Sequence, residues 1–193
     1  LQLRRRFPDI DVLVLERRCH PLPAARHKVG ESTVEIGAHY FAEVLGLKEH
    51  LQHSQLKKFG FRFFFSEGRR DLASVVELGA SRPLPFTSYQ IDRGLFENFL
   101  AEEAQRRGVR FFDGAVIRQV ALGSDGAPHE VHWHQATDEA PGDTLPVSRA
   151  RWLVDACGRA GLLKRQLGLA RENAHAAHAV WFRVARRIEI DRW

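Results

Sequence analysis

The chain has 193 residues, of which 44% are hydrophobic and 27% charged, and its net charge is +5 with neutral histidines. This composition excludes a disordered or fibrous chain and predicts a folded core. The basic residues fall in short dispersed clusters without interleaved aromatics, so we expect no nucleic-acid partner. No apolar run approaches the ~20 residues of a membrane span. We therefore expect no membrane span. The two cysteines make no disulfide framework, so we expect a cytoplasmic protein.

The first sixteen residues are typical of half a βαβ unit. Residues 1–7 predict the end of a helix, and the apolar run over residues 10–15 predicts a parallel strand buried on both faces. We expect the first strand of the unit, with its glycine-rich turn, to precede Leu1. Glu16 closes the visible strand, where a carboxylate can accept the hydroxyls of an adenosine ribose. A solvated strand end is the alternative.

A short loop motif, Lys28 to Ser32 (KVGES), precedes a predicted amphipathic helix over residues 33–47. Ser32 and Glu35 have the spacing of a capping box, in which Ser32 is the N-cap. The apolar positions expected on one helix face are Ile36, Tyr40, Phe41, Val44 and Leu45. Helix capping and a role for Gly30, Glu31 and Ser32 at a binding site are compatible readings.

The middle of the chain is rich in phenylalanine. Residues 57–65 (KKFGFRFFF) predict one strand, and residues 73–78 predict another after a turn. Lys57 and Lys58 open the first strand, and two solvated charges at a strand edge would protect it from edge pairing. The aromatic side chains expected in the core, with a substrate cage as the alternative, are Phe61, Phe63, Phe64, Phe65 and Trp181.

A second helix is predicted over residues 95–107, and Gly108 has the usual place of a C-terminal cap. Asp92 stands where it can cap the N-terminus of this helix. Arg93, close to Gln90, can meet a phosphate with its bidentate fork or form a surface ion pair with an aspartate. The sequence alone leaves both roles open.

The C-terminal half predicts a short strand over residues 109–112 and then an antiparallel meander. Its strands are expected over residues 116–122, 130–135 and 147–154, followed by a helix over residues 162–169 and a long bent strand over residues 174–190. Asp155 and Gly158 lie between the last meander strand and the helix, where backbone N–H groups can receive an anion.

Ten histidines prompt a search for a metal site, and three pairs are close in sequence: His50 with His53, His132 with His134, and His175 with His178. None has a cysteine or carboxylate at ligand spacing, so we expect no metal. The pair at 132 and 134 is expected to face solvent. No G-x-S-x-G motif supports a serine nucleophile.

The order of these motifs is more specific than any one of them. Glu16 at a strand end is followed by KVGES, by YQIDRGLF at residues 89–96, by Gly108-Val109 and Val116, and by LVDACG at residues 153–158. This order resembles the FAD-dependent oxidoreductases of the glutathione-reductase-like superfamily, and within them the flavin-dependent halogenases of the tryptophan and pyrrole type. The G-E-S tripeptide and the KKFGF strand carry the halogenase part of the resemblance.

The resemblance implies an α/β fold, namely an incomplete glutathione-reductase-like, Rossmann-type FAD-binding fold with an antiparallel meander and part of a substrate-domain sheet. It divides the chain into residues 1–56 (partial FAD-binding βαβ domain with a flavin strap), 57–91 (substrate-domain strands), 92–173 (return to the FAD-binding domain) and 174–193 (start of a second substrate-domain segment). The fragment alone is expected to be inactive.

The same resemblance implies the roles of individual residues. Glu16 would bind the adenosine ribose, Gly30 to Ser32 would form the strap beside the isoalloxazine, and Lys58, with Lys57 as the competing choice, would be the catalytic lysine. The full set expected at the cofactor is Glu16, Arg17, Gly30, Glu31, Ser32, Gln90, Arg93 (phosphates or ribityl chain), Val116 (adenine, through its backbone), Asp155 and Gly158.

In such halogenases reduced FAD from a separate flavin reductase, oxygen and halide give hypohalous acid, which a lysine directs to the substrate. The implied partners are therefore a transient flavin reductase and a small aromatic, pyrrole-type or carrier-bound substrate. An aromatic hydroxylase or geranylgeranyl-reductase-like enzyme on the same scaffold is the first alternative. A non-catalytic FAD-binding module is the second.

Overall fold

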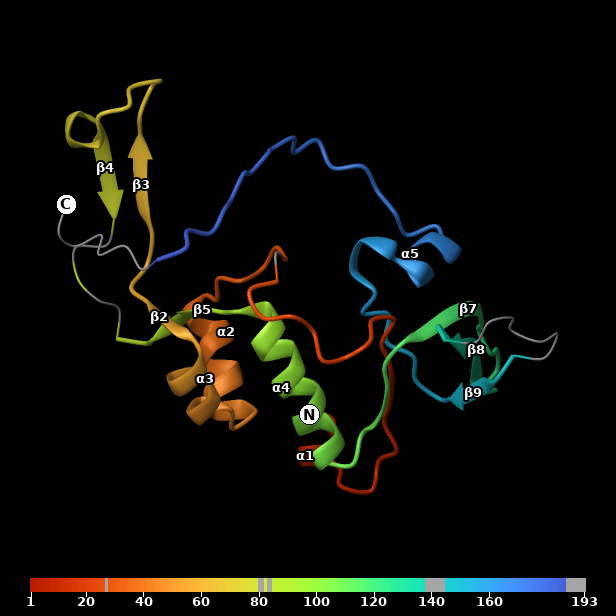
Figure 1. Cartoon of the computed structure of the whole chain (residues 1–193). Coiled ribbons are helices and arrows are strands. Elements are labelled where there is room, and N and C mark those ends of the chain that lie inside the picture. The colour runs from red at the N-terminus through yellow and green to blue at the C-terminus, as the bar shows by residue number, and fades with distance from the viewer. Residues whose placement is uncertain (27, 80–81, 83–84, 138–144, 187–193) are drawn as a thin grey trace. The chain divides into compact units, whose positions relative to one another are not determined.

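The computed structural model describes residues 1–26, 28–79, 82, 85–137 and 145–186 (Figure 1). The contacts within the chain divide it into two compact units, Leu1–Arg151 and Trp152–Trp193. Each unit is described by itself below. The boundaries of the four segments expected from the sequence remain a prediction.

A parallel strand pair lies near the N-terminal end of the first unit. Helix α1 (Gln2–Arg6) leads into β1 (Leu13–Leu15), which pairs in parallel with β6 (Arg110–Phe112). The predicted helix and parallel strand are thus confirmed. The prediction that the strand is buried on both faces is wrong, because β1 is half-buried and β6 is its one ladder partner within the described residues.

Helix α4 (Arg93–Arg106) is the longest helix described, and its ends follow the prediction. The Asp92 carboxylate accepts hydrogen bonds from the backbone N–H groups of Gly94 and Leu95 at 3.0 and 3.1 Å. Gly108 ends the helix region with a positive φ of 77°, a conformation that favours glycine. The capping residues therefore fix where α4 begins and ends.

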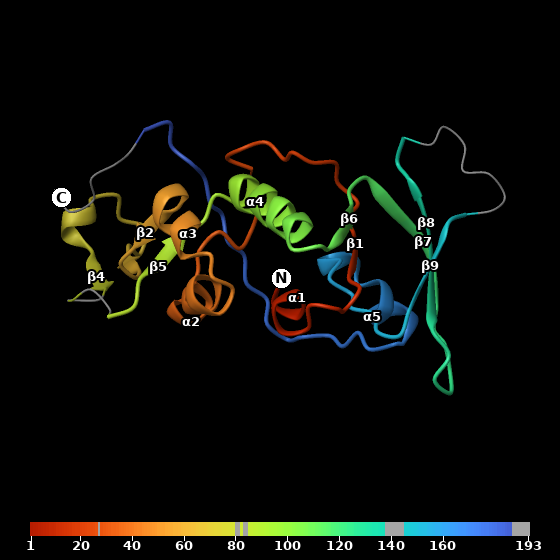
Figure 2. The ribbon, with the colours of Figure 1, turned by 90° about the horizontal axis from the view of Figure 1, so that it is seen from below.

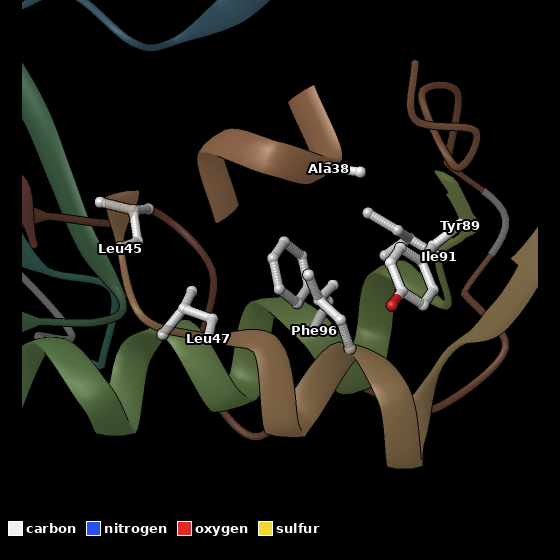
Figure 3. Packing of buried hydrophobic residues seen from close by; sticks show 7 residues of the cluster. Ala38, Leu45, Leu47, Tyr89, Ile91 and Phe96 are labelled. Carbon is white, nitrogen blue, oxygen red and sulfur yellow. The ribbon is translucent and has the colours of Figure 1, made fainter. Parts of the chain in front are cut away.

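The core packs against α4. Its buried members come from several elements: Ala38, Leu45, Leu47, Leu51, Tyr89, Ile91 and Phe96. Figure 3 shows the Phe96 ring at the centre of this cluster, with Tyr89 and Ile91 on one side and Leu47 on the other. The Phe41 ring meets Phe96 edge to face at 5.1 Å between centroids, a favourable aromatic geometry.

Two helices cover this core where one was predicted. α2 (Glu35–His39) continues into a π-helical turn (Tyr40–Val44), and α3 (Lys48–Ser54) follows, which the sequence analysis missed. The predicted apolar face is wrong in part: Ile36, Tyr40 and Val44 are 79%, 38% and 36% exposed, whereas Ala38 is buried. The capping-box prediction is wrong as well: Val34 is the N-cap of α2, and no side chain caps it.

The predicted strand over residues 57–65 is two strands with different partners. β2 (Leu56–Lys58) pairs antiparallel with β5 (Ser88–Gln90), and β3 (Arg62–Phe65) pairs antiparallel with β4 (Val76–Gly79), after a 3-10 turn at Leu72–Ser74 (Figure 1). Gly60 separates β2 from β3 with a φ of 111°. A single strand was the wrong expectation because this glycine leaves the extended conformation.

The phenylalanines of this region are not core residues. Phe61, Phe63 and Phe65 are 55%, 55% and 52% exposed, and Phe64 is half-buried. A two-stranded hairpin buries a face only when another layer covers it. No described element covers the face that carries these three rings, which is why the core prediction fails here.

The predicted meander is present as β7 (Ala115–Ala121), β8 (His129–Gln135) and β9 (Val147–Ala150), in that spatial order (Figure 1), and Figure 2 shows the same strands from another side, where they overlap. A bulge interrupts the β7–β8 register between Ile117 and Gln119. β9 ends four residues before its predicted end. His134 is buried instead of facing solvent, and its Nε2 lies 3.2 Å from the Arg118 guanidinium.

The second unit contains a 3-10 turn (Gly158–Ala160) and α5 (Leu162–Gln166). The long strand predicted over residues 174–190 is wrong for residues 174–186, which belong to no sheet among the described residues. Residues 187–190 lie outside the described residues. Trp181, expected in the core, is 38% exposed. No helix in the described part of the chain has the length and apolar character that crossing a membrane requires.

Gly94 provides a test of how the loop after β1 packs on α4. A Cβ at Gly94 would overlap the Pro23 carbonyl oxygen and come within 2.9 Å of its carbon. Because both atoms are backbone, Gly94→Ala should destabilise the fold by about 2–3 kcal/mol, measured by urea unfolding.

The control is Gly37→Ala in α2, where a Cβ meets only a Val34 methyl at 3.9 Å. That variant should gain about 0.5–1 kcal/mol from helix propensity. Equal unfolding free energies for the two variants would contradict the close packing at Gly94.

Candidate active site beside Lys58

Residues 30–33, which add Thr33 to the expected strap (Gly30 to Ser32) and are called the strap from here on, are held on β5. The backbone N–H of Thr33 donates to the Tyr89 carbonyl at 2.9 Å, and that of Ile91 donates to the Glu31 carbonyl at 2.5 Å. The Thr33 hydroxyl adds two bonds, accepting from the Tyr89 N–H at 2.7 Å and donating to its carbonyl at 3.0 Å. Ser32 forms an isolated bridge to Gln90. The strap is therefore an extra short strand beside β5.

Lys58 on β2 reaches this strap. Its ammonium donates to the Ser32 hydroxyl at 2.8 Å and to the Thr33 carbonyl at 2.5 Å, and lies 4.4 Å from the centroid of the Phe61 ring. Side chains alternate along a strand, so the neighbouring Lys57 points to the opposite side and is exposed. The structure thus joins the two sequence motifs, G-E-S and KKFGF, through one lysine.

A pocket of about 450 Å³ opens beside Lys58, between the start of α2 and the β3–β4 hairpin. Its lining comprises Val34, Glu35, Lys58, Gly60, Phe61, Phe63, Leu78 and Gly79. The walls are apolar apart from one carboxylate and one ammonium. Pockets of this size and character suit small organic ligands. Sequence reasoning missed Glu35 here because its spacing from Ser32 fitted the capping box.

A charge cluster fixes the loop that leads into the strap. The Glu97 carboxylate on α4 pairs with Lys28 at 2.6 Å and with Arg93. The Arg93 guanidinium also donates to the carbonyls of Val29 and Gly30 at 3.1 and 3.3 Å. Burial of Glu97 disfavours its charge, but the hydrogen bond from Lys28 and the charge of Arg93 outweigh this and hold its pKa below the ordinary value.

The loop between β1 and this cluster runs along α4. The Asn98 side chain on α4 accepts from the Leu22 N–H at 2.7 Å and donates to the Leu22 carbonyl at 2.8 Å, and Asp92 accepts from the Ala25 N–H at 2.8 Å. Asn98, like Glu97, carries no motif that would single it out in the sequence. Helix α4 thus links the two ends of this loop.

Glu16 lies directly after β1, and its half-buried carboxylate accepts a hydrogen bond from the Arg18 N–H at 2.9 Å. Arg17 beside it is exposed. The backbone of Glu16 continues the parallel pair through its N–H, which donates to the Phe112 carbonyl at 2.8 Å. A carboxylate held at the C-terminal end of a parallel strand is the arrangement that an adenosine ribose requires.

The remaining predicted residues have these places. Val116 is half-buried on β7 opposite His134, and Gln90 is exposed at the end of β5. In the second unit, Gly158 has a positive φ of 62°, and Asp155 accepts from the Cys157 thiol and from the N–H groups of Cys157 and Leu163. These hydrogen bonds lower the pKa of Asp155, and the bond from the Cys157 thiol has the largest effect.

At the predicted anion site beside Asp155 and Gly158, two backbone N–H groups already have an acceptor within the chain. The N–H groups of Cys157 and Leu163 are already bonded to the Asp155 carboxylate, so these two donors do not point to an external anion.

The residues at Glu16 and at the strap fit the parts of an FAD that they would contact. The Glu16 carboxylate can accept two ribose hydroxyls, and the strap presents backbone at Gly30, where φ is 94° and a Cβ would lie 3.1 Å from Arg93. Arg93 is bonded to Glu97 and to the loop carbonyls, so here it positions the loop. No group of three or more histidine, cysteine or acidic side chains suited to a metal occurs among the residues described.

Comparison with known proteins gives a family match. The model of the tryptophan halogenase family matches residues 80–182, which is more than half of the chain. No curated protein matches the chain by sequence.

Solved structures show the same fold. A flavoprotein/dehydrogenase from Cytophaga hutchinsonii has a TM-score of 0.65 at 20% identity, covering 86% of this chain and 38% of its own. The flavin-dependent halogenase CmlS has a TM-score of 0.64 at 22% identity, covering 86% and 28%. Halogenase PltM, in complex with phloroglucinol and FAD, has a TM-score of 0.61 at 21% identity, covering 83% and 32%. The chain thus spans about a third of these neighbours, which share a partial Rossmann-like FAD-binding fold.

The Glu97 cluster predicts a pH dependence. Because the pKa of Glu97 is lowered in the folded state, its contribution to stability is complete above the pKa of an unfolded glutamate and is lost as pH falls through the lowered value. The free energy of unfolding, followed between about pH 3 and pH 7, should therefore fall less in acid for Glu97→Gln than for the parent. Parallel curves for the two proteins would contradict the cluster.

Proposed function

Because this chain belongs to the tryptophan halogenase family, we propose that the complete protein is an FAD-dependent enzyme that halogenates a small aromatic or pyrrole-type substrate. One observation carries the proposal: the Lys58 ammonium lies against the strap and at the wall of an apolar pocket. A halogenating site needs a polar group that receives the halogen donor next to an apolar surface for the ring. Both features meet at Lys58.

When bound, reduced FAD with oxygen and halide supplies hypohalous acid, and a separate flavin reductase supplies the reduced flavin. Lys58 donates a hydrogen bond to the oxygen of the hypohalous acid, which makes the halogen more electrophilic. A ring carbon attacks the halogen, the halogen–oxygen bond breaks, and the ring loses one proton. The products are the halogenated ring and water, so the step needs no further oxidant.

The neighbours of Lys58 keep its amine in place. Ser32 and Thr33 accept two of its three N–H donors, and the ring of Phe61 attracts the cation from a third direction. A flexible lysine would otherwise lose side-chain entropy on each turnover. The strap thus preorganises the amine.

The cofactor roles follow the same proposal. Glu16, with Arg17 beside it, serves the adenosine ribose, and Gly30, Glu31 and Ser32 face the flavin. Arg93 acts mainly by fixing the strap loop through Val29 and Gly30, with Gln90 at the neighbouring strand end. The other expected contacts are Val116, at the adenine, and Asp155 and Gly158, along the cofactor.

A flavin-dependent hydroxylase or reductase is the second candidate, because a flavoprotein/dehydrogenase shares the fold. The complete protein, FAD, a flavin reductase, and chloride or bromide should be mixed with indole, pyrrole and phenol rings. Mass spectrometry should then find the halogen isotope pattern. Hydroxylated products alone would favour the second candidate, and flavin binding without turnover would favour a non-catalytic module.

Lys58 and Lys57 provide a matched pair for mutagenesis. Lys58→Ala should lower the halogenation rate at least ~100-fold, because it removes the donor at the pocket. Lys57→Ala should retain the parent rate, because that side chain is exposed and contacts neither strap nor pocket. Equal losses of halogenation rate in the two variants, measured by single-turnover kinetics, would contradict the assignment of Lys58 as the catalytic lysine.

The strap contact predicts a smaller effect for Ser32. Ser32→Ala removes one hydrogen bond to a cation, worth about 1–1.5 kcal/mol, and should lower kcat about 5–10-fold with little change in KM. Ser32→Thr keeps the hydroxyl and should recover most of the rate. A rate that is unchanged in Ser32→Ala would show that the strap does not position Lys58.

A further inference from the structure

Glu35 is a pocket-lining carboxylate that the proposed chemistry at Lys58 does not use. It lies in the first turn of α2, is half-buried, and lines the apolar pocket with Phe61, Phe63 and Leu78. Among the residues the structure describes, the Glu35 side chain has no hydrogen bond or ion pair. Its nearest acidic neighbour on this helical segment, Glu43, is instead paired with Lys48 at 3.1 Å.

An acceptor without a donor beside an apolar wall is costly when water is excluded. A ligand ring that fills the pocket removes water from the Glu35 carboxylate, so the ligand itself must supply a donor, or binding is penalised. The two charged groups bind different partners, because the Lys58 ammonium can only donate hydrogen bonds and the Glu35 carboxylate can only accept them.

From this arrangement we propose that Glu35 selects the substrate: the pocket takes a planar, uncharged aromatic ring that carries an N–H or O–H donor, and this donor bonds to the Glu35 carboxylate. The inference rests on the function proposed above and names the substrate class of the same site. It excludes rings whose donor is methylated, and it disfavours rings with an anionic group near Glu35.

The same contact also affects the chemistry at the ring. A carboxylate that accepts a hydrogen bond from a phenol O–H or an indole N–H draws the proton away and leaves more electron density on the ring. An electron-rich ring attacks an electrophilic halogen faster. Glu35 therefore acts on both binding and rate, so its effect belongs in kcat/KM.

Matched substrate pairs test this role: indole and 1-methylindole, pyrrole and 1-methylpyrrole, and phenol and anisole. For whichever ring class the complete enzyme halogenates, kcat/KM should favour the ring with the free donor by about tenfold or more. In parallel, NMR saturation transfer to the FAD-loaded protein without reductase measures binding of each pair with no turnover.

Glu35→Gln separates charge from shape. The amide keeps the volume of the side chain but weakens the acceptor, so the preference for the free donor should fall about threefold to fivefold. Glu35→Leu should abolish it. Glu43→Gln is the control on the same helical segment and should keep the parent preference, and thermal unfolding of each variant checks that it is folded.

The outcomes separate the two proposals. Halogenation with equal kcat/KM for both members of each pair would overturn the role of Glu35 and leave the proposed function intact. A preference that stays at the parent value in Glu35→Gln, or that survives in Glu35→Leu, would be steric and would also overturn it. Selective binding of the donor ring, lost in Glu35→Leu, without any halogenated product would support Glu35 and defeat the proposed function. Absence of both binding and turnover would overturn both.

Discussion

The pairing of the strap with β5 is the constraint on which the candidate site depends. Thr33 is 8% exposed, and its backbone and hydroxyl together make three hydrogen bonds to the backbone of Tyr89. These bonds satisfy polar groups that would otherwise be buried without partners. Because β5 also pairs with β2, the same ladder sets how far Lys58 lies from Ser32. A shift of one residue in the β2–β5 register would turn Lys58 to the other face, and the same shift of the strap on β5 would turn Ser32.

Helix α4 gives this ladder its support. Its N-terminal cap, Asp92, also accepts from the Ala25 N–H, and its side chains Glu97 and Asn98 bind the loop that leads from β1 to the strap. Gly94 lets the Pro23 carbonyl approach the helix closely. On another face, Phe96 packs in the core with Tyr89 of β5 (Figure 3). One helix therefore fixes both the strap loop and the strand that the strap joins.

Local rules predicted the parts of the fold that local chemistry determines. The Asp92 cap and the Gly108 end of α4 depend on residues within a few positions of one another, and the meander pairs strands that follow one another in the chain. The split at Gly60 had a local signal, because a glycine inside a strand pattern often marks a break, and the sequence analysis did not use it. The π turn after His39 had no such signal in the neighbouring residues. The exposed rings of Phe61, Phe63 and Phe65 were placed in the core because hydrophobicity alone does not say whether a covering layer exists.

The candidate site was predictable in part for the same reason. Lys58 and the G-E-S tripeptide could be singled out by their order in the chain, and the structure adds that they touch. Glu35 could not be found this way, because a glutamate three residues after a serine fits a capping box equally well. In the structure Val34 is the N-cap, so Ser32 does not cap the helix and instead accepts a hydrogen bond from Lys58. Glu35 lines the pocket. Where a local motif has two uses, tertiary contacts decide between them.

A crystal structure of the complete protein with FAD and a donor-bearing aromatic ring tests the central claim most directly. It should place the Lys58 amine within hydrogen-bond distance of the Ser32 hydroxyl, with the flavin along the strap and the ring between Phe61 and Glu35. A Lys58 side chain turned away from the strap, with the ring bound elsewhere, would contradict this account.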